Sequence, residues 1–198
     1  WYDGETGSLD FGYVYATTDA GGRLQQGSVV FTALSHDVVV HETTHALLDG
    51  MRPLFLEPTH NDVAAFHEGF SDLVALLMRY QYRDLVERGL DHGMGLAAPL
   101  LTEVARQWGR SSGSGREALR RVLLAAGDAD EPVKAAYRYN PRREAHDLGG
   151  VLVAAVIEAM SRVFDRKTKR LRRLGATPHA PQNDLLSLLA SEAQKIAK

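Results

Sequence analysis

The feature that most constrains this chain is the pentapeptide His41-Glu42-Thr43-Thr44-His45, an H-E-x-x-H motif. On an α-helix, residues four apart lie on one face, about 6 Å apart along the axis. Two imidazoles placed in this way can bind one metal ion, with zinc–nitrogen distances of about 2.0–2.1 Å. Glu42 points about 100° away from His41, so it can take a proton from an activated water instead of binding the metal. The motif therefore predicts a helix that carries a zinc site.

The residues around the motif favour a largely buried helix. They are mostly apolar: Val38, Val39, Val40, Ala46, Leu47 and Leu48. Asp49-Gly50 then provides a helix stop. The alternative is an ordinary buried helix with two hydrogen-bonded histidines. Because burial of two histidines and a glutamate is costly unless they are compensated, a bound metal ion explains the pattern better.

A second acidic pair follows in another apolar, helix-compatible segment. Glu68 and Asp72 are four residues apart, so both carboxylates share one helix face. One carboxylate can complete a His-His-Glu ligand set and leave the fourth position to water. The other can accept the spare N–H of a ligand histidine and select its tautomer. The alternative is a solvated acidic face, but Gly69 and Ser71, not cations, lie between the two acids.

H-E-T-T-H at 41–45 and H-E-G-F-S-D at 67–72 together resemble the gluzincin metallopeptidases, and the thermolysin-like group in particular. This resemblance implies that His41, His45 and Glu68 bind one Zn²⁺ per chain. It also implies that Glu42 is the general base, and that Asp72 hydrogen-bonds a ligand histidine.

The resemblance further implies a zincin fold, which is α+β and mostly helical. Residues 1–50 would form the last part of a β-rich lobe together with the H-E-x-x-H helix. Residues 51–198 would form a helical lobe that carries the third ligand. We expect strands at 11–16 and 28–32, in segments rich in aromatic and β-branched residues.

A third stretch, R-R-E-A-H-D-L-G-G-V at 142–151, places His146 near the start of a helix. Thermolysin-like enzymes have a histidine in such a position that donates to the oxyanion of the tetrahedral intermediate, and fungalysin-type relatives resemble H-x-x-G here. His146 is therefore the candidate oxyanion stabiliser. An alignment on D-x-G-G-V would instead place Leu152 at that position, and His146 would then be a capping or surface residue. No tyrosine matches the family's transition-state tyrosine.

Two positions depart from the family pattern. Where the family has an acidic residue that shares calcium with the Asp37 position, this chain has Arg79. We therefore expect an Asp37–Arg79 ion pair and no calcium at Asp37. His67 stands where the family often has asparagine. His60 and His67 are rival metal ligands. For His67 the alternatives are a contact to the ligand His45 and a surface position, and we expect the surface position.

Composition limits the partners. The 198 residues carry a formal net charge of −2, so no general attraction to nucleic acid or to an anionic membrane is expected. The basic segment 161–174 is interpreted as the solvated end of a helix. There is no cysteine, which excludes thiolate ligands, and no apolar run is long enough to span a membrane. Secretion and a cytoplasmic location both remain open. The expected partners are a peptide or protein substrate and an upstream N-terminal segment or domain.

The remaining segments predict helices at 61–88, 96–108, 116–126 and 185–197. The predicted function is zinc-dependent hydrolysis of internal peptide bonds. One alternative is an aminopeptidase on the same zinc site. Another is a non-catalytic binding or scaffold module that retains zinc, although such a module would have no use for a base at Glu42.

Overall fold

The computed structural model describes residues 1–16, 25–52, 57, 59–91, 95–97, 101, 103–104, 120–121, 138–175 and 182–198. Within these ranges the chain is mostly helical and has small two-stranded antiparallel sheets, which confirms the α+β, mostly helical class. None of the helices in these ranges is both long enough and apolar enough to cross a bilayer.

The helices are α1 (His36–Met51), α2 (Asn61–Arg79), α3 (Arg83–Asp91), α7 (Ala145–Gly175) and α8 (Gln182–Ile196). Short 3₁₀ helices η1 and η2 span Thr32–Leu34 and Gly95–Ala97. The strands are β1 (Tyr2–Asp3), β2 (Ser8–Leu9), β3 (Tyr13–Tyr15), β4 (Val29–Phe31), β5 (Glu103–Val104) and β6 (Arg120–Arg121). They pair as β1–β2, β3–β4 and β5–β6.

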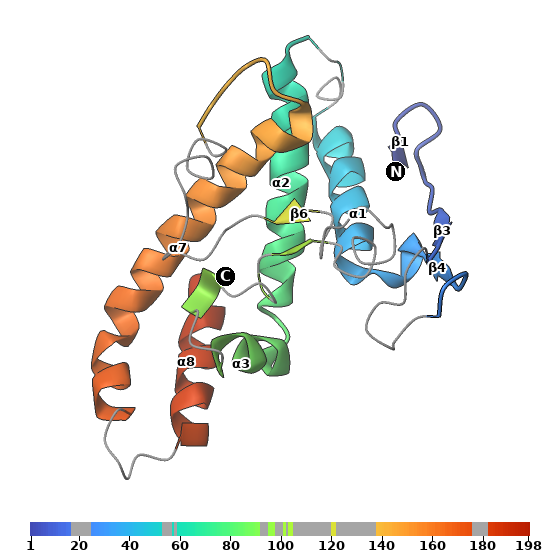
Figure 1. Cartoon of the computed structure of the whole chain (residues 1–198). Helices are drawn as coiled ribbons and strands as arrows, with labels where there is room; N and C mark the ends of the chain where they lie inside the picture. The colour runs from blue at the N-terminus through green and yellow to red at the C-terminus, as the bar shows by residue number, and fades with distance from the viewer. Residues whose placement is uncertain are drawn as a thin grey trace.

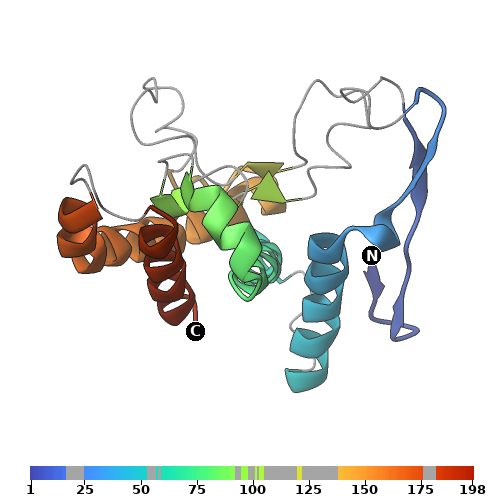
Figure 2. The same cartoon turned by 90° about the horizontal axis from the view of Figure 1, so that it is seen from below.

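Helix α2 is the centre of the arrangement. The long helix α7 runs along one side of it, and α1 packs on the other side (Figure 1). The β3–β4 hairpin lies beyond α1, at the opposite edge of the molecule from α7 (Figure 2). Helices α3 and α8 pack against each other near the C-terminal half of α2.

The hydrophobic core joins α2, α3, α7 and α8 at one end of the molecule. Its members are Leu76, Tyr80, Val86, Leu90, Leu96, Leu101, Val153, Ile157, Met160, Phe164, Leu189, Ala190 and Ala193. In α7 the buried residues recur every three or four positions, which is the spacing of one helix face. The core anchors the C-terminal half of α2, so the N-terminal half of α2 is held between α1 and the start of α7.

The strands predicted at 11–16 and 28–32 are confirmed as β3 and β4. They form a hairpin in which Val14 pairs with Val30 and Tyr13 pairs with Phe31. The hairpin leads through η1 directly into α1.

The helix predicted at 61–88 is wrong in one respect, because the chain breaks between α2 and α3 at residues 80–82. Tyr80 is fully buried there in the core. The Gln194 side-chain amide of α8 donates to the Tyr80 carbonyl oxygen at 2.8 Å and to that of Gln81 at 3.2 Å. The Gln194 amide thus satisfies the backbone carbonyl groups of Tyr80 and Gln81, where the chain leaves α2. Packing against the core and α8 outweighs the local helix propensity at these residues.

The helices predicted at 96–108 and 116–126 are wrong at residues 103–104 and 120–121, whereas residues 96–97 lie in η2 and Leu101 is helical. Residues 103–104 and 120–121 are extended and pair with each other as β5 and β6. The predicted helix at 185–197 is confirmed, although α8 begins three residues earlier, at Gln182.

Candidate metal centre

Helix α1 presents the H-E-x-x-H residues toward α2. The two imidazoles lie one turn apart, with ring centroids separated by 4.7 Å. Of the motif, His41, Thr44 and His45 are buried. Leu47, in contrast, is 60% exposed, and α1 continues through Gly50 to Met51. The face of α1 that packs against α2 therefore carries the polar motif. The predicted burial is confirmed for Leu48 and wrong for Leu47, and α1 ends at Met51, one residue beyond the predicted stop.

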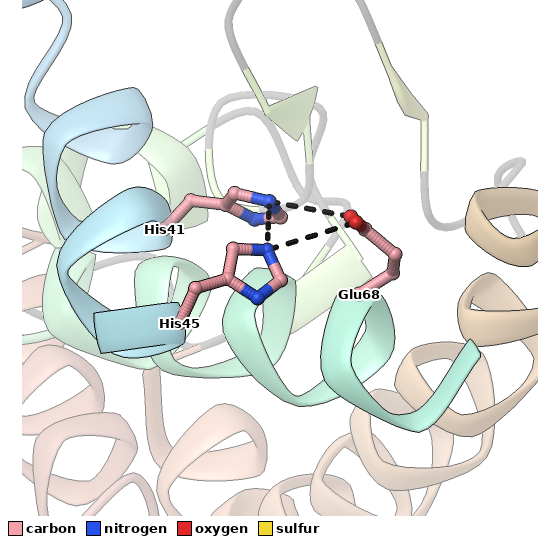
Figure 3. Close-up of side chains that lie close together, drawn as sticks. All are labelled: His41, His45 and Glu68. Carbon is pink, nitrogen blue, oxygen red and sulfur yellow. Dashed lines mark hydrogen bonds and ion pairs between the residues drawn. The ribbon is translucent and has the colours of Figure 1, made fainter. Parts of the chain in front are cut away.

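Helix α2 brings Glu68 to the two histidines, as Figure 3 shows. One Glu68 carboxylate oxygen lies 3.3 Å from His41 Nε2 and the other lies 3.7 Å from His45 Nε2. The two Nε2 atoms are 3.1 Å apart. His41, His45 and Glu68 thus form a His-His-Glu group whose ligand atoms lie close enough together to hold one metal ion.

These separations fit a tetrahedral metal site. Ligand atoms about 2.0–2.1 Å from a tetrahedral ion lie about 3.3 Å from one another, close to the 3.1 and 3.3 Å separations at His41 Nε2. Two imidazole lone pairs and a carboxylate that face one point repel each other unless a positive charge lies between them. The three donors therefore suit a divalent cation with one coordination position left for water.

Glu68 is suited to act as an anionic ligand. Burial alone would raise its pKa, but a hydrogen bond from His146 holds the pKa of Glu68 well below its ordinary value. Glu68 is therefore a carboxylate at neutral pH.

Asp72 contacts Nδ1 of His41, the ring nitrogen that does not face Glu68. Its Oδ1 atom lies 2.8 Å from His41 Nδ1, and its side chain is buried. A carboxylate at this nitrogen keeps the proton on Nδ1 and directs the Nε2 lone pair toward the metal position. The structure therefore separates the two acids that the sequence left equivalent, since Glu68 faces both Nε2 atoms and Asp72 faces Nδ1.

The prediction that His67 lies at the surface is wrong. His67 is 3% exposed, and its Nδ1 lies 3.3 Å from His45 Nδ1. The two ring planes are nearly parallel, with an interplanar angle of 12°. The small residues Ser71 and Ala75 follow at one-turn intervals and are also buried, so α1 can approach this face of α2 closely. That run of small residues is the sequence signal that could have placed His67 inside.

His67 gives His45 the partner that Asp72 gives His41. With its proton on Nδ1, His45 donates to the neutral Nδ1 of His67 and presents its Nε2 lone pair to the metal position. The other rival ligand, His60, is 62% exposed and accepts a hydrogen bond from the Asp62 backbone N–H at the start of α2. His60 is therefore a capping residue.

Replacement of His67 by leucine is expected to weaken zinc affinity by about 10- to 100-fold, because His45 loses the group that orients it. His67→Asn should retain most of the affinity, since an amide oxygen can accept the same hydrogen bond. Competition with a chromophoric chelator measures the zinc affinity of both variants. His36→Leu, an exposed position on α1, is the control. Wild-type affinity in His67→Leu would contradict this role.

Glu42 lies outside the His-His-Glu group and follows His41 directly on α1. Its Oε2 accepts the Tyr2 backbone N–H at 3.0 Å, and the Tyr2 hydroxyl donates to Asp49 Oδ2 at 2.7 Å. Trp1 and Asp10 exchange the backbone hydrogen bonds of the β1–β2 pair, so the Tyr2 N–H points away from β2. Strand β1 thereby contacts the Glu42 carboxylate at one oxygen, Oε2.

His146 reaches the site from the first turn of α7. Its Nε2 lies 3.1 Å from Glu68 Oε2, and its side chain is 47% exposed. Its Nδ1 contacts Glu144, a residue that the sequence analysis did not single out. Glu144 faces Nδ1 and thereby orients Nε2 toward Glu68, so that a proton on Nε2 can be donated in that direction. The spacing E-x-H just before a helix was the available signal.

The segment before α7 is tied to the start of α2. Asn61 Nδ2 donates to the Arg143 carbonyl oxygen at 2.8 Å, and the Tyr139 hydroxyl lies 3.1 Å from both Asp62 carboxylate oxygens. The segment just before α7 is therefore joined to the first turn of α2, the helix that carries Glu68.

The predicted Asp37–Arg79 ion pair is confirmed. Arg79 Nη2 lies 2.7 Å from Asp37 Oδ2, and both side chains are largely buried. Asp37 Oδ1 accepts the Ser35 hydroxyl at 2.7 Å. This pair joins the first turn of α1 to the last turn of α2, close to His41.

Comparisons with protein-family models, with curated proteins and with solved structures found no match to this chain.

Proposed function

We propose that this chain is a zinc-dependent peptidase of the gluzincin type, with a thermolysin-like zincin fold, and that it cleaves internal peptide bonds. The single observation that carries the proposal is the meeting of three donors from two helices, His41 and His45 from α1 and Glu68 from α2, with separations of 3.1–3.7 Å. A zinc ion bound by them would polarise the scissile carbonyl and lower the pKa of a coordinated water.

The other residues of the site suit this reaction. Glu42 stands outside the ligand set, and its carboxylate is held by the Tyr2 N–H at 3.0 Å. It takes the proton of the attacking water and passes it to the leaving amine. His146, held by Glu144 and adjacent to Glu68, donates to the developing oxyanion. With no tyrosine assigned to this task, His146 is the side chain that we assign to oxyanion stabilisation.

The scaffold alternative has less support. A module that only retains zinc has no use for a base at Glu42, and structural zinc sites in general have four protein ligands. The structure brings three such groups together among the residues that it describes. An aminopeptidase on the same site would need further acids to bind the substrate amine, and nothing in the sequence resembles the exopeptidase motif.

Metal content and cleavage test the proposal together. Purified wild-type protein is expected to bind one zinc per chain and to cleave members of a mixed peptide library at internal bonds. His45→Ala should lose both properties, whereas the exposed His36→Leu should keep both. Absence of zinc in the wild type would refute the proposal. Zinc without cleavage would favour the scaffold alternative, and release of single N-terminal residues would favour the aminopeptidase.

A further inference from the structure

Helices α2 and α7 cross with their backbones in direct contact at Gly69 and Gly149. A Cβ atom added to Gly69 would lie 2.6 Å from the Gly149 carbonyl oxygen and 3.0 Å from its Cα. A Cβ added to Gly149 would lie 2.6 Å from both the Ala65 carbonyl oxygen and the Gly69 nitrogen. All of these atoms belong to the backbone, so no change of rotamer can relieve the contact. The two helices reach this separation only because both positions are glycine.

This crossing lies beside the candidate metal centre. Gly69 follows the ligand Glu68 in α2, and Gly149 lies one turn after His146 in α7. His146 is half-exposed and is not fixed by burial, yet its Nε2 lies 3.1 Å from Glu68 Oε2. The separation of the two helix backbones therefore determines whether His146 reaches Glu68.

Other contacts prevent α7 from adjusting easily. At its start, the Asn61 side chain holds the Arg143 carbonyl oxygen. Further along, Val153 and Ile157 are fully buried in the core with Leu76 of α2. Because α7 is held on both sides of Gly149, a Cβ at that position would push the turn between these contacts away from α2 and move His146 away from Glu68.

We propose that Gly69 and Gly149 are positioning residues for the reaction, because the absence of a Cβ at both places His146 against Glu68 and the substrate carbonyl. The inference rests on the proposed function and deepens it. An added methyl group must move about 1 Å to reach ordinary van der Waals contact. A displacement of about 1 Å in a catalytic group can lower the rate by on the order of 100-fold.

The experiment compares Gly149→Ala with Gly150→Ala in the zinc-loaded protein. A Cβ at Gly150 meets nothing within 4 Å, and both changes raise helix propensity by a similar amount. The difference between them therefore reports the close contact. We expect Gly149→Ala to lower kcat by about 10- to 100-fold with a smaller effect on KM. Zinc content should be unchanged, since the three ligands come from α1 and α2. Gly150→Ala should behave as wild type.

A coupling measurement separates positioning from general damage. In a His146→Ala background, Gly149→Ala should cause little further loss of kcat, because the group that it displaces is absent. Equal losses in the two backgrounds would overturn the inference, as would equal activities of Gly149→Ala and Gly150→Ala.

A readout that does not need activity comes from the Co²⁺-substituted protein. Because His146 contacts the ligand Glu68, Gly149→Ala should change the visible absorption spectrum in the same direction as His146→Ala, and Gly150→Ala should leave it unchanged. An unchanged spectrum in Gly149→Ala would overturn the inference. If wild-type protein binds zinc but cleaves no peptide, the proposed function fails. The spectrum alone then decides whether the two glycines place His146 against Glu68.

If Gly149→Ala does not fold, Gly69→Ala probes the same contact from α2, with its Cβ directed at the Gly149 carbonyl oxygen. It is expected to give the same spectral change and the same coupling to His146→Ala. Wild-type spectra and kcat in Gly69→Ala would overturn the inference.

Discussion

Glu42→Gln is expected to lower kcat/KM for peptide cleavage by about 100- to 10,000-fold and to leave one zinc bound per chain. General-base catalysis contributes a factor of that size, and glutamine cannot accept the proton of the attacking water. The change preserves the shape of the side chain, and the amide oxygen can still accept the Tyr2 N–H that now meets Glu42 Oε2 at 3.0 Å. Steady-state kinetics on a cleaved library peptide, together with metal analysis, measures both quantities.

The control for this experiment is Glu87→Gln, which removes one acid from the exposed ion pair with Arg83 on α3. It should leave kcat/KM and zinc content unchanged. A Glu42→Gln protein that loses its zinc would show that Glu42 is a ligand or a structural residue, which contradicts the general-base role. A Glu42→Gln protein that cleaves at the wild-type rate would contradict the role directly.

Arg79→Leu is expected to lower the free energy of unfolding by about 3–5 kcal/mol, because it leaves the buried Asp37 carboxylate without its cation. Their atoms are separated by 2.7 Å, and the two side chains are 12% and 8% exposed. Since small domains are stable by only about 5–15 kcal/mol in total, the loss should be evident in urea denaturation. The loss should also reduce zinc affinity, since Asp37 lies one turn before His41 on α1.

Two controls define this effect. Arg162→Leu breaks an exposed i,i+4 pair with Glu158 and should cost at most about 1 kcal/mol. Asp37→Leu combined with Arg79→Leu should recover much of the loss, because paired apolar side chains leave no buried charge. Equal costs for Arg79→Leu and Arg162→Leu would show that the buried pair contributes no special stability.

The same pair gives an expectation for calcium. Addition of calcium or a chelator should not change the thermal midpoint of the wild-type protein through Asp37, because the Arg79 guanidinium already occupies its Oδ2. A calcium-dependent midpoint that disappears in Asp37→Asn would refute this.

The candidate site could be predicted to a large extent from the sequence because it depends on helix periodicity. The four-residue spacing of His41 and His45, and of Glu68 and Asp72, determines which side chains share a face as soon as each segment is helical. The strands at β3 and β4 and the Asp37–Arg79 pair were predicted for similar local or motif-based reasons. The zinc ion and the peptidase activity remain proposals.

The errors lie where the outcome depends on which helix packs against which. Burial of His67 follows from the close approach of α1 to the face of α2 that carries Ser71 and Ala75. The break at residues 80–82 follows from hydrogen bonds donated by Gln194 of α8. Pairing of residues 103–104 with 120–121 is a long-range backbone interaction that local propensity cannot report.

By itself, the sequence determined the donor types, their spacing on two helices and the position of Glu42 outside the His-His-Glu group, since these follow from covalent order and 3.6 residues per turn. Only the tertiary structure decided that Glu68 faces the Nε2 atoms, that Asp72 faces Nδ1, and that Glu144 holds His146 beside Glu68. The physical reason is that these contacts depend on the distance and angle between helix axes. In α2 and α7 the backbone contact of Gly69 with Gly149 sets that distance.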